Sequence, residues 1–238
     1  MKTFKILLFL SAVVFFNKSY AQKTVYDANA QVRNVGSFTG ISVSSAIDLY
    51  ITMGSDDAVA VSGSDKTYTN AISTEVRNGM LYIGYKSSGV NWGAKSMKAY
   101  VSIKSISKLM ASGASDVYVD GSLNGTDLSI ELSGASDFKG DINIQNLRLK
   151  ASGSSDFIIS GKTSNAKIEV HGSSDVKGFD LIADNCDVEA SGSSDVNITV
   201  NKRLKATASG SSDIRYKGEA TVKEVNTSGS SDIKKVKA

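Results

Sequence analysis

Ser112-Gly113-Ala114-Ser115-Asp116 is the first of seven copies of one short sequence that decides the fold. The other copies are Ser133 to Asp137, Ser152 to Asp156, His171 to Asp175, Ser191 to Asp195, Ser209 to Asp213 and Ser228 to Asp232. Their final aspartates are separated by 21, 19, 19, 20, 18 and 19 residues. A repeat near twenty residues over half of a chain is typical of a solenoid, in which each repeat packs only on its neighbours.

Apolar residues alternate with polar residues on both sides of each copy. Leu128, Ile130 and Leu132 precede the second copy, and Phe157 and Ile159 follow the third. A period of two places these side chains on one face of a β-strand. A helical interpretation fails, because so short a repeat cannot hold a helix pair and Gly-Ser-Ser is poor helix material. Each repeat is therefore predicted to be one coil of a β-helix, with about 19–20 residues per coil.

The same alternation predicts a direction for each residue of the repeated sequence. Counting by twos from Leu149 through Ala151 places Gly153 and Ser155 on the inward face. The first serine, the third residue and the aspartate then face outward. Gly and Ser also suit a tight turn or a narrow corner, and a corner here would disturb the alternation beyond Gly153.

Residues 1–21 have the features of a secretory signal peptide. The basic start Met1-Lys2-Thr3-Phe4-Lys5 precedes an apolar run from Ile6 to Phe16, and Ser19-Tyr20-Ala21 fits a cleavage site. The run is too short for a membrane span, and no later stretch is long enough. We therefore predict export to the periplasm, the outer-membrane surface or the extracellular space, with no transmembrane segment in the mature chain. An uncleaved anchor is the alternative.

Charge and composition argue against several function classes. Removal of the leader takes three of the 27 basic residues and leaves 24 basic against 24 acidic residues. This balance gives no support for binding nucleic acid or anionic membranes, so neither is predicted as a partner. The single cysteine, Cys186, cannot form an internal disulfide and is predicted to be buried and inert. The single histidine, His171, excludes a metal site built from several histidines.

The domain organisation follows from where the repeat is regular. Residues 22–37 are polar and weakly patterned, and they are predicted to form a flexible or loosely docked start. One solenoid domain is predicted over residues 38–235. Within it, residues 38–105 are expected to form an irregular β cap, and residues 106–235 the regular coils.

The predicted cap contains several local signals. Asn78-Gly79 between two strand-like stretches predicts a tight hairpin. Ser44 to Ile51 resembles a degenerate copy of the repeat, and Ser62-Gly63-Ser64-Asp65 is a second candidate copy. Ser87 to Ser96 is a polar loop that holds Trp92.

Coils stacked in register would align the seven aspartates about 4.8 Å apart on the surface. The row consists of Asp116, Asp137, Asp156, Asp175, Asp195, Asp213 and Asp232. Each neighbouring pair would repel by about 0.9 kcal/mol in bulk water. Two residues after the aspartate, four of the copies carry a cation, namely Lys139, Lys177, Arg215 and Lys234, and these are predicted to offset the repulsion.

Three roles are open for this row. The simplest is structural, with each carboxylate accepting backbone N–H groups at the corner. The second is Ca²⁺ bound between stacked carboxylates, although no cofactor is otherwise predicted. The third is contact with another ligand, in which case the aspartate row and Trp92 form the ligand-facing surface.

Three features together resemble a known family. They are the opening Phe38-Thr39-Gly40-Ile41-Ser42-Val43, the hairpin Asn78-Gly79-Met80-Leu81-Tyr82-Ile83 and the repeated Ser-Gly-Ser-Ser-Asp sequence. They are similar to the family of "putative auto-transporter adhesins, head GIN domain", which is common in Bacteroidetes and has no known function. The resemblance covers about residues 35–235. It implies a right-handed parallel β-helix like that of pectin lyases, without conserved catalytic residues, and a role in cell adhesion.

The sequence therefore favours an exported, non-enzymatic binding module. Its expected partner is a glycan or a protein at a cell surface, and the sequence predicts no oligomeric state. One alternative is a structural envelope protein with no specific ligand. The other is a polysaccharide-active β-helix enzyme that uses paired carboxylates. Every coil offers the same acids, however, whereas an active site should break the repeat.

Overall fold

The computed structural model describes residues 27–85 and 96–237. The predicted signal peptide, residues 1–21, and Trp92 lie outside the described residues. The described chain contains sixteen strands, which belong to one hydrogen-bonded sheet, and one short helix, α1 (Lys66–Ala71). The all-β prediction is confirmed.

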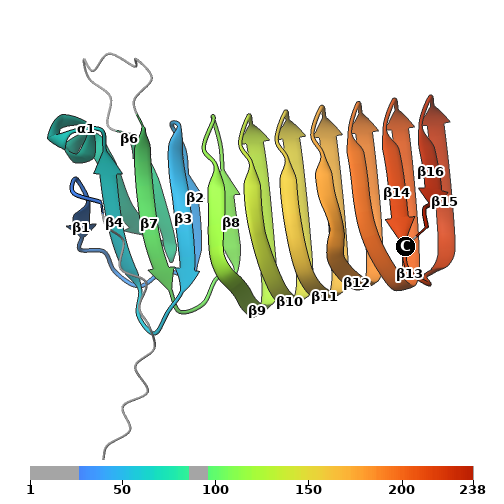
Figure 1. The fold of residues 1–238 in the computed structure, drawn as a ribbon, viewed down its shortest axis with the longest axis horizontal. Helices are drawn as coiled ribbons and strands as arrows, with labels where there is room; N and C mark the ends of the chain where they lie inside the picture. Colours follow the sequence, from blue (N-terminus) through green and yellow to red (C-terminus); the bar gives the residue numbers. More distant parts are fainter. Residues whose placement is uncertain (1–26, 86–95, 238) are drawn as a thin grey trace, which may run out of the picture.

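The repeated part of the chain is a parallel β-solenoid. Its strands are β8 (Lys108–Ala111), β9 (Val117–Gly134), β10 (Phe138–Gly153), β11 (Phe157–Gly172), β12 (Val176–Gly192), β13 (Asp195–Gly210), β14 (Asp213–Lys217), β15 (Thr221–Gly229) and β16 (Asp232–Lys235). Each long strand from β9 to β13 pairs in parallel with the next. Figure 1 shows the coils side by side along the long axis, so the prediction of one coil per repeat is confirmed.

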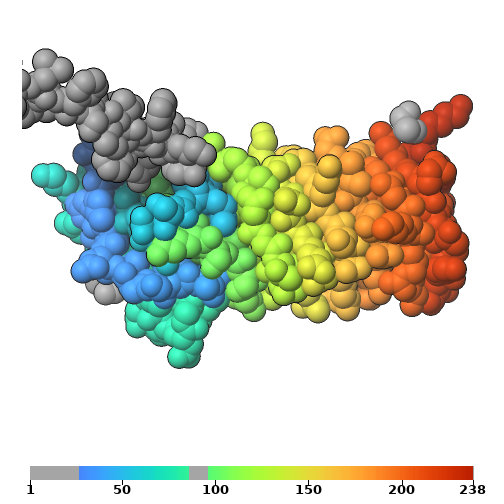
Figure 2. All heavy atoms as spheres, turned by 90° about the horizontal axis from the view of Figure 1, so that it is seen from below, coloured from blue at the N-terminus to red at the C-terminus, as the bar shows by residue number. Residues whose placement is uncertain are grey.

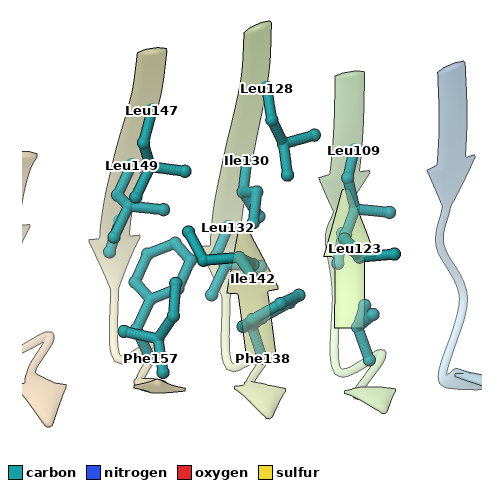
Figure 3. Packing of buried hydrophobic residues seen from close by; sticks show 14 of the residues in the cluster. Leu109, Leu123, Leu128, Ile130, Leu132, Phe138, Ile142, Leu147, Leu149 and Phe157 are labelled. Carbon is teal, nitrogen blue, oxygen red and sulfur yellow. The ribbon is translucent and has the colours of Figure 1, made fainter. Parts of the chain in front are cut away.

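The core is formed by the inward residues of successive coils. Figure 3 shows Leu109, Ile130 and Leu149 beside one another, and Phe138 beside Phe157. The pairing register aligns these residues, and all five are fully buried. Because the register places like positions together, each coil covers the apolar stripe of its neighbour.

The chain turns sharply at each copy of the repeated sequence. All seven copies have their glycine at positive φ, between 77° and 92°. The serine two residues later is fully buried in the first six copies. The inward direction predicted for this serine is confirmed, whereas the inward direction predicted for the glycine is wrong. The corner glycine is exposed, because the left-handed turn swings the backbone outward before the chain returns to the core.

A second, gentler bend lies within the long strands. Gly121 and Gly161 have φ values of 82° and 112°, and the pairing register shifts close to both of them. Figure 1 shows the long strands curving as they pass from one side of the solenoid to the other. Each coil therefore has one sharp corner and one broad bend.

The N-terminal region combines a first coil with antiparallel strands. Its strands are β1 (Gln31–Arg33), β2 (Gly40–Val43), β3 (Ile47–Met53), β4 (Ala58–Gly63), β5 (Ile72–Arg77), β6 (Met80–Tyr85) and β7 (Met97–Ile103). β2 pairs in parallel with β8, and β3 pairs in parallel with β9. The predicted degenerate copy at Ser44 to Ile51 is confirmed, because this register aligns Leu49 with Val117, so that Asp48 stands beside Asp116.

The remaining strands extend this region away from the solenoid. β4 pairs antiparallel with β7, and β1 pairs antiparallel with β4. Strand β1 belongs to residues 22–37, which were expected to form a flexible or loosely docked start, so part of that segment is docked on the sheet. The predicted hairpin is confirmed by β5 and β6, with Asn78 and Gly79 both at positive φ. In Figure 2 the N-terminal region is broader than the solenoid.

The second candidate copy, Ser62 to Asp65, is not a coil corner. Asp65 instead caps helix α1, and its carboxylate accepts hydrogen bonds from the backbone N–H groups of Thr67 and Tyr68. An aspartate before a helix is a favoured cap, because it satisfies free N–H groups of the first turn. The prediction failed because a Ser-Asp sequence suits a helix cap as well as a coil corner.

Candidate functional site

The aspartate row lies on the outside of the solenoid, at the sharp corner. From Asp116 to Asp195, the Oδ1 atom of each aspartate accepts a hydrogen bond from the backbone N–H of the next aspartate, at 2.9–3.3 Å. The prediction that these carboxylates accept backbone N–H groups is confirmed. The donor, however, belongs to the neighbouring coil rather than to the aspartate's own turn.

Three of the four predicted cations pair with this row. Lys177 Nζ lies 2.7 Å from Asp156 Oδ2. Arg215 bridges two coils, with contacts of 3.1 Å to Asp195 and 2.6 Å to Asp213. Lys234 lies 3.1 Å from Asp232. Lys139 forms no ion pair among the described residues.

The buried serines form a second row of hydrogen bonds between coils, and these bonds run in the opposite direction to those of the aspartates. The Oγ of Ser136 accepts the N–H of Ser115 at 3.1 Å, and the Oγ of Ser155 accepts the N–H of Ser136 at 3.2 Å. In the aspartate row a side chain satisfies the N–H of the following coil, whereas in the serine row it satisfies the N–H of the preceding coil. The two rows together complete the hydrogen bonds of a corner where the chain leaves regular strand geometry.

Asp48 extends the aspartate row to the first coil. Burial and the negative charge of Asp116 raise the pKa of Asp48 above its ordinary value, although the backbone N–H of Asp116 opposes this change. The folded state therefore binds the proton of Asp48 more tightly than the unfolded state does. The charged form of Asp48 therefore destabilises the folded protein at neutral pH. This destabilisation vanishes below the ordinary aspartate pKa, where Asp48 is protonated in both the folded and the unfolded state.

Asp48→Asn should raise the unfolding midpoint at pH 7 and leave it unchanged near pH 3. Asparagine keeps the acceptor oxygen and removes the charge. Because Asp48 is only partly buried, solvent screening keeps the gain small, at about 1–2 °C. Thermal unfolding at both pH values measures the effect. Asp195→Asn is the matched control, and it should lower the midpoint at pH 7, because it removes an ion pair with Arg215. A lower midpoint for Asp48→Asn at pH 7 would contradict the prediction.

The geometry limits what the row offers a ligand. One carboxylate oxygen of most of these aspartates is used by the neighbouring backbone, and several of the other oxygens are used by cations. Within residues 27–85 and 96–237, no three His, Cys, Asp or Glu side chains are grouped to hold a metal ion. Ligand contact by the aspartate row remains a prediction, as does ligand contact by Trp92.

A shallow groove lies at the broad bend, away from the aspartate row. We call it the bend groove, and its volume is about 570 Å³. Its lining residues come from β9, β10, β11 and β12, namely Asn124, Gly125, Asn143, Ile144, Gln145, Lys162, Thr163, Ser164, Ile182 and Asp184. This volume is within the usual range for ligand sites, which is about 300–1,000 Å³.

The bend groove differs chemically from the sharp corner. The pairing register aligns Asn143 with Asn124 and with Lys162, and it aligns Lys162 with Ile182. One row of outward positions therefore carries amide, ammonium and apolar side chains in turn. Sequence analysis missed this site because its residues change from coil to coil and form no motif. Only the stacking of four coils brings them together.

The two singular residues of the repeat have ordinary surroundings. Cys186 is free and buried as predicted, and burial raises the pKa of its thiol, so the thiolate is disfavoured. His171 Nδ1 lies 2.7 Å from Ser191 Oγ and takes its place in the row of first serines. Among the described residues, no helix has the length and apolar character of a membrane span.

Comparisons with known proteins agree with this architecture. The family described as "Putative auto-transporter adhesin, head GIN domain" matches residues 37–220. A "putative adhesin" from Bacteroides fragilis is 19% identical, with a TM-score of 0.82, over 87% of this chain and 96% of that one. A "putative adhesin" from Parabacteroides merdae is 19% identical, with a TM-score of 0.71, over 87% and 95%. A "putative lipid binding protein" from Parabacteroides distasonis is 21% identical, with a TM-score of 0.66, over 89% and 98%. No curated protein sequence matches the chain.

Proposed function

Because this chain belongs to the "Putative auto-transporter adhesin, head GIN domain" family, we propose that it is an exported, non-enzymatic adhesion module that binds a cell-surface glycan. The signal-peptide features of residues 1–21 support export. The bend groove is the observation that carries the binding role. It spans four coils and is lined mainly by polar side chains.

The side chains of the groove suit an extended polar ligand. The side-chain amide of Gln145 has no hydrogen-bond partner among the described residues, and neither has the ammonium of Lys162. Ile182, which is 38% exposed, adds an apolar surface beside them. Sugars present hydroxyl groups at their edges and C–H groups on their faces, so a mixed amide and aliphatic surface is complementary to them.

The carboxylates of the groove favour binding over hydrolysis. Glycoside hydrolysis ordinarily requires two carboxyl groups that flank the scissile bond. The residues that line the bend groove include one carboxylate, Asp184, and its Oδ2 is 3.0 Å from Lys202 Nζ. An ion-paired acid without a partner acid is poorly suited to act as a general acid or a nucleophile.

Asn143→Trp should weaken binding to glycan-coated surfaces, because an indole ring at this position would fill the groove. We expect the purified protein to bind at least one glycan of an immobilised panel, and Asn143→Trp to weaken that binding at least about tenfold. The matched control is Ser154→Trp, which places the same ring at an exposed position of the sharp corner and should leave binding unchanged.

Three outcomes would contradict the proposal. Retention of glycan binding by Asn143→Trp together with its loss in Ser154→Trp would assign the ligand to the aspartate side of the coil. Release of new reducing ends from a bound glycan would support the hydrolase alternative. Absence of binding to every glycan of the panel would leave the structural envelope role as the better account.

A further inference from the structure

We propose that the bend groove selects acidic glycans, and that the ammonium of Lys162 binds the carboxylate of a uronic acid. This inference rests on the proposed function, and it specifies the ligand class of the same site. It depends on the position of one cation, on the amides beside it and on the ion pair formed by the groove's own acid.

Lys162 is an exposed cation that lines the groove and has no ion-pair partner among the described residues. Several other lysines of the solenoid, by contrast, contact a carboxylate. Lys177 pairs with Asp156 at 2.7 Å, and Lys205 pairs with Glu224 at 2.7 Å. The ammonium of Lys162 is therefore available to an anionic ligand.

Amide groups beside Lys162 are held in a defined orientation. Asn124 Nδ2 donates to the backbone carbonyl of Ser122 at 2.9 Å, and Asn143 Nδ2 donates to Asn124 Oδ1 at 3.4 Å. The Oδ1 atom of Asn143 accepts no hydrogen bond among the described residues, so it can accept one from a sugar hydroxyl. Gln145 offers both a donor and an acceptor.

The single acid of the groove does not oppose an anionic ligand. Asp184 forms an ion pair with Lys202 at 3.0 Å, which offsets its charge. Successive coils are about 4.8 Å apart, so an extended glycan lying along the axis would meet the rows of several coils in turn. The carboxylate of one sugar would contact Lys162, while its neighbours contact Asn143 and Ile182.

The test uses two polymers with the same backbone, namely polygalacturonate, whose carboxylates are charged, and its fully methyl-esterified form, whose esters are neutral. We expect the full-length protein to bind polygalacturonate, and Lys162→Gln to weaken that binding about tenfold, as the loss of one charge-assisted hydrogen bond implies. Lys162→Arg should remain within about twofold, because it keeps the charge. Lys139→Gln is the control, since it removes another exposed lysine without an ion pair, outside the groove. Binding should also weaken as the salt concentration rises.

The outcomes separate this inference from the proposed function. Equal binding of the charged and esterified polymers, still blocked by Asn143→Trp, would overturn the acidic preference and keep the groove as a glycan site. An equal loss in Lys139→Gln and Lys162→Gln would also overturn it, because the effect would then come from overall charge. Failure of Asn143→Trp to affect any polymer would contradict both.

Discussion

Phe157→Ala should lower the free energy of unfolding by about 3–5 kcal/mol, the largest effect expected of any single substitution considered for this protein. Phe157 is fully buried, and its ring centroid lies 5.9 Å from that of Phe138 in the preceding coil. Removing the ring loses its burial and leaves a cavity between coils. A solenoid coil contacts only its two neighbours, so little of the structure can move to fill that cavity. Urea unfolding followed by circular dichroism measures the loss.

Two control substitutions identify the source of this effect. Phe157→Leu keeps most of the volume and should cost less than about 1.5 kcal/mol. Ile158→Ala alters the adjacent residue, which is 44% exposed, and should change stability by no more than about 0.5 kcal/mol. Similar losses of unfolding free energy for Phe157→Ala and Ile158→Ala would contradict the view that burial of Phe157 between coils stabilises the core.

The repeat predicted the coil well because the same physical requirement recurs in every copy. A period of two defines an inward stripe, and each coil must cover the stripe of its neighbour. The alternation correctly predicted that Ser155 is buried, although serine is not a typical core residue. Its hydroxyl oxygen accepts a hydrogen bond from the backbone N–H of Ser136 at the corner, so this polar side chain can be buried beside the apolar stripe.

The same reasoning failed where the backbone leaves the strand. Counting by twos assumes that every residue is extended, and Gly153 is not, because its φ is 86°. The degenerate copy at Ser44 to Ile51 and the helix cap at Asp65 show a related limit. A short Ser-Asp sequence fits several local structures, and the pairing of strands decides among them.

The candidate site was less predictable than the fold. The aspartates recur in sequence because every corner needs the same hydrogen bonds, and recurrence made them visible as a possible ligand surface. Lys162 and Asn143 carry no such signal. These two residues are recognised as neighbours only when the strand register aligns them. The register also shifts near the broad bend, and the spacing of the copies in the sequence does not reveal these shifts.

Gly153→Ala should lower the free energy of unfolding by about 3–4 kcal/mol, although it adds a single methyl group. Two causes contribute. A residue with a Cβ atom in the left-handed region costs about 1–2 kcal/mol. In addition, a Cβ at this position would lie 2.5 Å from the carbonyl oxygen of Gly134 in the preceding coil. That oxygen already accepts a hydrogen bond from the N–H of Ser154 at 2.8 Å, so it cannot move away without breaking the corner ladder.

Gly121→Ala separates the two causes, because Gly121 has a similar φ of 82° but no atom within 4 Å of its Cβ position. It should cost only the about 1–2 kcal/mol of the backbone conformation. Ser45 supports this distinction. It takes the glycine position of the degenerate copy at Ser44 to Ile51 with a φ of 71°, and no earlier copy of the repeat precedes it in the sequence. Equal losses for Gly121→Ala and Gly153→Ala in urea unfolding would mean that the turn alone requires glycine. A larger loss for Gly153→Ala would mean that close stacking of the coils requires it.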